Sequence, residues 1–264
     1  MSSPPEDQGN NIKPRPVTYF KIWEPWRESV IEQHRFYVDQ GRNKLLSQFN
    51  NIEQEADKAA EHWLEKQSHH FDPDRDDPGS FEEDAYHEGI EYFRLLSELR
   101  DQTRLNIVAG MYHAWDKELR RWLQKEIEHW HIGSIVSDRV WKATFEEIVE
   151  LLDSLGLLNH NAAYLRRLSA CRYVVNVYKH GEGLSMCKLK ACHPEYLSIQ
   201  FPMGNTHNRR GADHTHLLVT NKHFDEFSNA IVEFWRMLPS KVSSETLNVP
   251  AWFKRAVERD RKTP

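Results

Sequence analysis

Four polar side chains of complementary chemistry occur in the stretch "RYVVNVYKHGEG", residues 172–183, whose other members are mostly valine and tyrosine. They are Arg172, Asn176, Lys179 and His180. Each helical residue turns its side chain by about 100°, so a helix over this stretch presents all four on one face. Arginine and lysine neutralise a phosphate, asparagine orients it by hydrogen bonding, and histidine transfers a proton near neutral pH. The stretch therefore predicts a site that binds and transforms a phosphate group.

The end of a helix offers a second explanation for part of this stretch. Lys179 and His180 in a last turn complement the helix dipole, and Gly181 suits the left-handed conformation that ends many helices. This explanation leaves out Arg172 and Asn176, which lie two turns and one turn earlier on the same face. We therefore keep both explanations, a helix end and a site.

Such a site could cleave RNA, because the ribose 2′-OH already supplies the nucleophile. His180 would act as general base or acid, beside a phosphate that Arg172 and Lys179 neutralise and Asn176 positions. The product of this transesterification is a 2′,3′-cyclic phosphate. The reaction needs no metal ion and no cofactor, and we expect neither.

The sequence resembles the HEPN superfamily over roughly residues 94–240. The resemblance rests on "LRRLSACRYVVNVYKHGEGLSMCKLK" and "LLVTNKHFDEFSNAIVEFWRMLP", which are similar to a bacterial branch with an "N..KHG" pattern. The superfamily hallmark is an arginine followed four to six residues later by a histidine. Arg172 and His180 match those positions, although seven residues separate them here and Tyr173 replaces the usual polar neighbour.

The resemblance implies an all-α four-helix bundle with the motif late in its third helix. It also implies a metal-independent endoribonuclease of a toxin–antitoxin or antiphage-defence system, in which two protomers join their motifs into one cleft. We therefore expect a homodimer with residues 172–183 at or beside its two-fold axis. RNA would be the substrate, and an antitoxin or another defence protein would be a further partner. The rival hypothesis is a non-catalytic HEPN-like module that binds RNA or a partner protein.

Composition favours a packed protein. The chain has 264 residues, of which 39% are hydrophobic, with nine tryptophans and twelve phenylalanines for the core. Its three cysteines, an odd and low number, favour reduced thiols and a cytoplasmic location. No apolar run approaches about 18 residues, and the first residues lack the pattern of a signal peptide, so we expect no membrane segment.

Charge is spread unevenly along the chain. Residues 53–91 hold fourteen acidic and three basic residues, a local charge of −11. Because the whole chain carries −5, the remainder carries +6. A partly basic body with an acidic arm can still bind a polyanion such as RNA.

Apolar periodicity predicts helices over 26–67, 81–130, 145–155, 162–180 and 221–238. A seam close to a heptad repeat in the first of these contains Leu45, Phe49, Ile52, Ala56, Ala59 and Trp63. An acidic turn with two prolines separates the first two helices, which together predict an αα-hairpin. Ser80 and Glu83 have the spacing of a capping box for the second helix, and "HIGSIVSD" predicts a break after it.

Residues 181–219 form an irregular insertion, in which "YLSIQF" and "HTHLLVT" have the composition of short strands. Its loop "NTHNRRGADH" contains three candidate RNA contacts, His207, Arg209 and Arg210, although a surface loop without a ligand explains it as well. The insertion also holds residue types that bind zinc, namely Cys187, Cys192, His193, His207, His214 and His216. Their spacing is loose, so buried thiols and loop histidines are the competing explanation, and we expect no metal site.

The predicted fold is thus all-α, a HEPN-like four-helix bundle with an added helical hairpin and a small irregular insertion. We expect a disordered arm over 1–17, a helical extension with its acidic turn over 18–80, and the bundle over 81–240. A basic tail, with a short docking helix, follows over 241–264.

Overall fold

The computed structural model describes residues 17–72, 74–198, 212–244 and 248–262. Helices account for most of these residues, so the predicted all-α class is confirmed. The chain divides into two compact units. The first comprises Met1–Arg27, Glu118–Ala162 and Arg236–Pro264, and the second comprises Glu28–Lys117 and Ala163–Trp235. The HEPN-like arrangement of a bundle stays a prediction.

The second unit contains most of the long helices. They are α1 (Glu24–Gln40), α2 (Ile52–Gln67), α3 (Pro78–Glu128), α6 (Ala163–His180), α7 (Leu184–Cys192) and α8 (Asn221–Met237). The chain passes from α1 to α2 through a π-helical turn, η1 (Gly41–Leu45), and a 3-10 turn, η2 (Leu46–Phe49). Three further 3-10 turns are η3 (Ser68–His70), η4 (Pro194–Tyr196) and η6 (His214–His216). Helices α1, α3 and α8 each contribute residues to both units.

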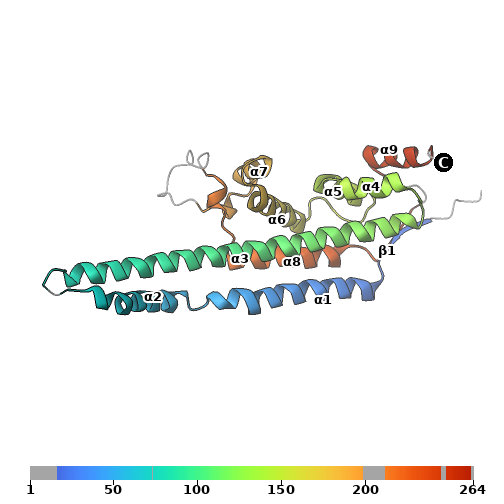
Figure 1. Cartoon of the computed structure of the whole chain (residues 1–264). Helices are drawn as coiled ribbons and strands as arrows, with labels where there is room; N and C mark the ends of the chain where they lie inside the picture. Colours follow the sequence, from blue (N-terminus) through green and yellow to red (C-terminus); the bar gives the residue numbers. More distant parts are fainter. Residues whose placement is uncertain (1–16, 73, 199–211, 245–247, 263–264) are drawn as a thin grey trace, which may run out of the picture. The chain divides into compact units, whose positions relative to one another are not determined.

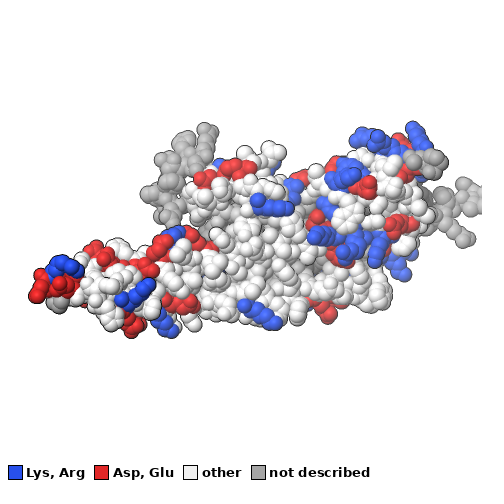
Figure 2. Space-filling view, in the orientation of Figure 1, with Lys and Arg blue, Asp and Glu red and all other residues white. Residues whose placement is uncertain are grey.

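The predicted αα-hairpin is present as α2 and the first part of α3, which lie side by side (Figure 1). Trp63 packs on Phe81 with 5.3 Å between ring centroids. At Gly89 an added Cβ would meet the Ala56 carbonyl oxygen and the Ala60 Cβ at 3.2 Å, so small residues let the backbones approach. The heptad-like seam therefore packs within its own hairpin, and Figure 2 shows acidic side chains gathered at the turn.

Two predictions for this hairpin were wrong. The helix expected over 26–67 is interrupted between Gln40 and Ile52, where buried Gly41 lies so close to α3 that a Cβ would meet Ile107 at 3.0 Å. The capping box of Ser80 is absent, because α3 begins earlier, at Pro78. Asp77 caps it instead, accepting a hydrogen bond from the Gly79 amide at 3.2 Å.

The core of the second unit forms where α1, α3, α6 and α8 meet. Trp115 of α3 and Tyr164 of α6 both contact the ring of Phe234 in α8, with centroids 5.2 and 6.2 Å away. The residues of α3 at this core are at most 3% exposed, namely Val108, Met111 and Trp115, and Leu119 and Trp122 continue the same buried stripe into the first unit. Helix α1 joins α8 through His34, whose Nε2 lies 2.9 Å from the Ser228 hydroxyl.

The first unit combines short helices with a two-stranded antiparallel sheet, β1 (Val17–Lys21) and β2 (Lys241–Ser244). Its helices are the end of α3, α4 (Ser134–Lys142), α5 (Phe145–Ser154) and α9 (Ala251–Asp260). Both strands and α4 were missed, because β1 begins at the boundary of the expected disordered arm and "HIGSIVSD" contains the start of a helix as well as a break. The short helix expected in the tail is α9.

Helix α4 is held by a buried charge at each end. At its N-terminus, Asp260 accepts hydrogen bonds from the amides of Ile135 and Val136 at 2.9 and 3.0 Å. At its C-terminus, the Arg120 guanidinium donates to the carbonyl oxygens of Val140 and Ala143 at 2.7 and 2.9 Å. An anion at the first turn and a cation at the last both complement the helix dipole.

No helix in the described part of the chain combines the length and apolar composition that a bilayer crossing would require.

Replacing Asp260 with asparagine should destabilise the protein by about 1–3 kcal/mol, since α4 loses a charged acceptor that also pairs with His131 at 3.0 Å. Burial opposes ionisation of this carboxyl, but the hydrogen bonds from His131 and the two amides outweigh it and lower its pKa. Denaturant unfolding measures the loss. The control is Glu258→Gln, an exposed change in α9, the helix that also contains Asp260. Its unfolding free energy should stay within about 0.5 kcal/mol of that of the parent.

Stability should fall as pH drops from 6.5 to about 4, in part because of His34. Burial lowers the pKa of His34 to about 4, although its hydrogen bond with Ser228 acts in the opposite direction. The unfolded chain takes up this proton below pH 6.5 and the folded chain does not, so up to roughly 3 kcal/mol is lost across that window. His34→Gln should flatten the pH dependence of the unfolding free energy. An unchanged slope would show that His34 protonates equally in both states.

Candidate catalytic site

Helix α6 separates an apolar face from the polar face predicted from its sequence. The apolar side is fully packed, with Leu168, Cys171 and Val175 at most 2% exposed. Burial raises the pKa of the Cys171 thiol well above its usual range, so this cysteine is no nucleophile. The polar side holds half-buried Arg172 and Asn176 and exposed Lys179 and His180.

The end of α6 has the conformation that its glycine predicts. Gly181 has φ of 70°, and its amide donates to the Val177 carbonyl oxygen at 2.8 Å. The helix-end explanation therefore holds for this turn. It is compatible with a site, because the side chains of Lys179 and His180 remain exposed.

The four predicted residues share a face without forming one tight group. Arg172 lies two turns before His180, a rise of roughly 12 Å along the axis. Its guanidinium carbon is 4.8 Å from the centroid of the Tyr173 ring. Asn176 donates to the Ser185 hydroxyl in α7 at 3.3 Å, so its amide ties the two helices together. Lys179 and His180 are thus the predicted residues nearest to the exposed helix end.

Lys179 lies close to a histidine that sequence reasoning missed. His113 of α3 has a lowered pKa, first because of partial burial and then because of the positive charge of Lys179. Asp116 acts in the opposite direction, and Lys117 adds to the lowering. A neutral imidazole beside a lysine is therefore available on this side of α6.

A second histidine lies directly beside the end of α6. The ring of His214 is 3.8 Å from the position that a Cβ on Gly181 would occupy. Glu182 holds this histidine in two ways: its Oε1 accepts the His214 amide hydrogen at 2.8 Å and lies 3.5 Å from the ring Nδ1. Both side chains are about half exposed, at 53% and 54%. His180 and His214 therefore flank one short turn, Gly181–Glu182.

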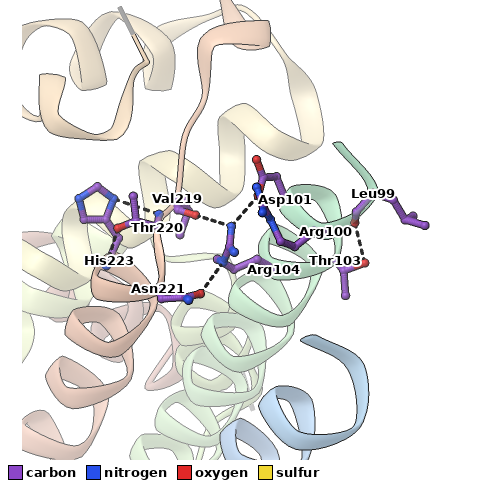
Figure 3. A network of polar contacts seen from close by, with 9 residues as sticks. All are labelled: Leu99, Arg100, Asp101, Thr103, Arg104, Val219, Thr220, Asn221 and His223. Atoms are coloured by element: carbon purple, nitrogen blue, oxygen red, sulfur yellow. Dashed lines mark hydrogen bonds and ion pairs between the residues drawn. The ribbon is translucent and has the colours of Figure 1, made fainter. Parts of the chain in front are cut away.

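The chain that follows His214 enters α8 through a polar network (Figure 3). Arg104 of α3 donates to the Val219 carbonyl oxygen and the Asn221 side chain, both at 3.0 Å, and to Asp101 at 2.8 Å. Thr220 and His223 cap α8 reciprocally. The preceding residues are held by the bridge between Leu197 and Leu217, which lie in the two segments of predicted strand composition.

The structure distributes the residues of the zinc alternative among separate partners. His193 lies 3.6 Å from Glu195, and the Nδ1 of His216 lies 2.9 Å from Asp213. Cys187 and Cys192 are exposed free thiols. Among the residues that the structure describes, no three His, Cys, Asp or Glu side chains are grouped to hold a metal ion. His207, and the predicted RNA contacts Arg209 and Arg210, lie outside the described residues.

Sequence reasoning could not pair His180 with His214 or Lys179 with His113. These pairs are separated by 34 and 66 positions, and no local spacing signals either one. His214 was noticed only as a metal-ligand type, and Glu182 only as part of a helix end. Both pairings are tertiary, because one depends on where the insertion returns to α8 and the other on how α6 packs beside α3.

Comparisons of the chain with family models, with curated proteins and with solved structures gave no match.

Replacing Arg172 with alanine should separate structure from function. Arg172 is half-buried and stacks on an aromatic ring, so we expect a loss of about 1 kcal/mol in unfolding free energy, together with loss of RNA cleavage. Trp115→Ala, which empties a core position, should cost about 3–5 kcal/mol. Chemical denaturation and a cleavage assay on the same preparations measure both. A loss for Arg172→Ala as large as that for Trp115→Ala would make Arg172 a structural residue.

Proposed function

We propose that this protein is a metal-independent endoribonuclease whose proton donor and acceptor are His180 and His214. The observation that carries the proposal is the place of the His214 ring, 3.8 Å from the Cβ position of Gly181 and oriented by Glu182. In-line cleavage of RNA uses one proton acceptor and one proton donor, and the imidazoles of His180 and His214, beside one short turn, can supply this pair. The resemblance to HEPN domains supports a role in a toxin or antiphage-defence system.

Each group has a definite part in the proposed reaction. One histidine accepts the proton of the ribose 2′-OH, and the 2′ oxygen attacks the adjacent phosphorus. The bond from phosphorus to the 5′ oxygen breaks, and the other histidine donates a proton to that leaving oxygen. The products are a 2′,3′-cyclic phosphate and a free 5′-hydroxyl. Lys179 neutralises the phosphate, Asn176 helps to position it, and Arg172 contacts the strand further along α6.

Substitution of either histidine should abolish cleavage without unfolding the chain. Purified parent protein is incubated with single-stranded RNA in EDTA, and the product ends are identified by mass spectrometry. We expect a cyclic phosphate from the parent, and a rate lower by about 10²–10⁴-fold for His180→Ala and for His214→Ala. His87→Ala, which removes an exposed histidine of α3, is the matched control and should leave the rate unchanged.

Three results would contradict the proposal. They are a 3′-hydroxyl product, equal rates for parent and both histidine variants, and loss of activity in EDTA with recovery on adding Zn²⁺. The predicted homodimer stays a prediction. Because His180 and His214 lie in the same chain, two-fold symmetry is not required to bring two imidazoles together.

A second candidate function is the non-catalytic rival, with the hairpin as a docking arm for a partner protein. Large apolar side chains that are 39–66% exposed line the first part of α3, namely Tyr86, Ile90, Tyr92, Phe93, Leu95 and Leu99. Tyr86, Ile90 and Phe93 share one face of the helix, and exposed apolar surface of this kind marks protein interaction sites. If docking is the function, Tyr86→Ser with Ile90→Ser and Phe93→Ser should relieve any growth arrest on expression, while the two histidine variants should not. The endoribonuclease proposal expects histidine substitution to relieve that arrest.

A further inference from the structure

The first unit contains a concave surface that the proposed active site does not use. It is a pocket of about 420 Å³ between α4 and α9, and we call it the α4–α9 groove. Its principal lining residues are Arg139, Lys142, Glu147, Trp252, Arg255 and Arg259. Figure 2 shows Lys and Arg side chains gathered over these two helices. The groove therefore combines a hollow with positive charge.

Cations outnumber carboxylates in the groove, and the nearby carboxylates of Glu147 and Asp260 already bond to other parts of the first unit. Glu147 caps α5 with Thr144 and pairs with Arg139, and these hydrogen bonds lower its pKa despite some burial. Asp260 is only 5% exposed and is bonded to the first turn of α4. Among the lining residues, four cations face two carboxylates, Glu147 and Asp138, which gives a net +2.

The exposed side of α9 extends this charge in a line. Arg255, Arg259 and Lys262 recur at intervals of four and three residues, so they lie on one face over roughly 10 Å of helix axis and its continuation. Lys254 and Arg261 flank them, all five are exposed, and the one exposed carboxylate of α9, Glu258, lies beside the row. A row of cations at regular spacing suits a chain of phosphates better than a single anion.

The wall of the groove also offers a flat surface for a base. The guanidinium carbon of Arg139 lies 4.6 Å from the centroid of the buried Trp252 ring. The pairing with Glu147 holds the same guanidinium from another direction, and the Arg139 side chain keeps 30% exposure. Unpaired RNA bases stack on such held guanidinium planes, while a double helix keeps its bases covered.

We propose that the α4–α9 groove binds the backbone of single-stranded RNA, with Arg255, Arg259 and Lys262 on successive phosphates and Arg139 against a base. This inference rests on the proposed function in taking RNA as the substrate. A membrane surface would also attract these cations, but a concave groove with a buried tryptophan fits a strand better than a flat bilayer.

The test separates binding from cleavage. Fluorescence anisotropy with a labelled 12-nucleotide RNA is measured on the His180→Ala protein, which should not cut the probe. Reversing the charge of the row, with Arg255→Glu, Arg259→Glu and Lys262→Glu, should weaken binding at least tenfold. It should also reduce the slope of log affinity against log salt by about 2, as expected for three lost phosphate contacts on a single strand.

The control carries the same change in net charge at another place. Lys44→Glu, Lys58→Glu and Lys66→Glu alter three exposed lysines of the second unit and should leave affinity within about twofold. The milder set Arg255→Gln and Lys262→Gln should give an intermediate loss, which keeps the test valid if the triple reversal fails to fold. Circular dichroism checks the fold of every variant.

If both triple sets weaken RNA binding equally, the net charge of the protein alone determines the affinity, and the proposal that the groove binds RNA is wrong. Absence of RNA binding by the His180→Ala protein at low salt would overturn it too, as would groove-dependent binding of phosphatidylserine vesicles without RNA binding. Groove-dependent binding with no cyclic phosphate from the parent would refute the proposed catalysis and leave the groove supported. Cleavage that survives all groove substitutions with unchanged KM would refute the groove and leave the catalysis supported.

Discussion

The buried guanidinium of Arg104 holds the start of α8 against α3, and the segment that enters α8 there carries one histidine of the candidate site. It is 8% exposed, and it joins Asp101 on its own helix to the residues where the chain enters α8. A buried charge of this kind is costly unless its donors are satisfied, so it strongly favours one arrangement of the partners it bonds. The segment ending at Val219 is thereby held against α3, and His214 sits within it. The chain that leads from the second imidazole into α8 is thus anchored by an arginine to which the proposed reaction assigns no part.

The first unit uses the same principle at helix α4. Asp260 and Arg120 come from positions far apart in the sequence, and they satisfy the two ends of a helix of only nine residues. So short a helix is not stable by itself, and its direction is set by these two charges. Gly133 permits the contact, since a Cβ there would lie 2.1 Å from an Asp260 oxygen. In both units, then, buried charged side chains connect segments that are distant in the sequence. The charged side chains that a ligand can reach are the exposed ones on the surface.

This explains what the sequence could and could not predict. Periodic apolar positions in α3, α6 and α8 predicted helices with nearly correct ends, because burial of one face determines a long helix. The interruption at Gly41 and the start of α3 at Pro78 depend on close approach to another helix and on a side-chain cap, which periodicity does not report. The strands β1 and β2 pair across more than 200 positions, so neither is evident locally. The polar face of α6 followed from spacing alone, whereas its histidine partners required the tertiary path of the insertion.

The net charge around the candidate site determines how strongly it can attract a polyanion. Lys179 is the exposed cation closest to the turn, and Glu182 beside it supports His214 with a negative charge. With Arg172 and Lys179 against Glu182, the candidate site has a net charge of only +1, and binding to nucleic acid depends on the number of phosphates neutralised. Under the proposed function, affinity for RNA would have to come from other residues, and the row of cations along α9 carries positive charge of the kind required. A net charge of −5 does not argue against the proposed RNA groove, because residues 53–91 alone carry −11 and the lining of the groove carries a local positive charge.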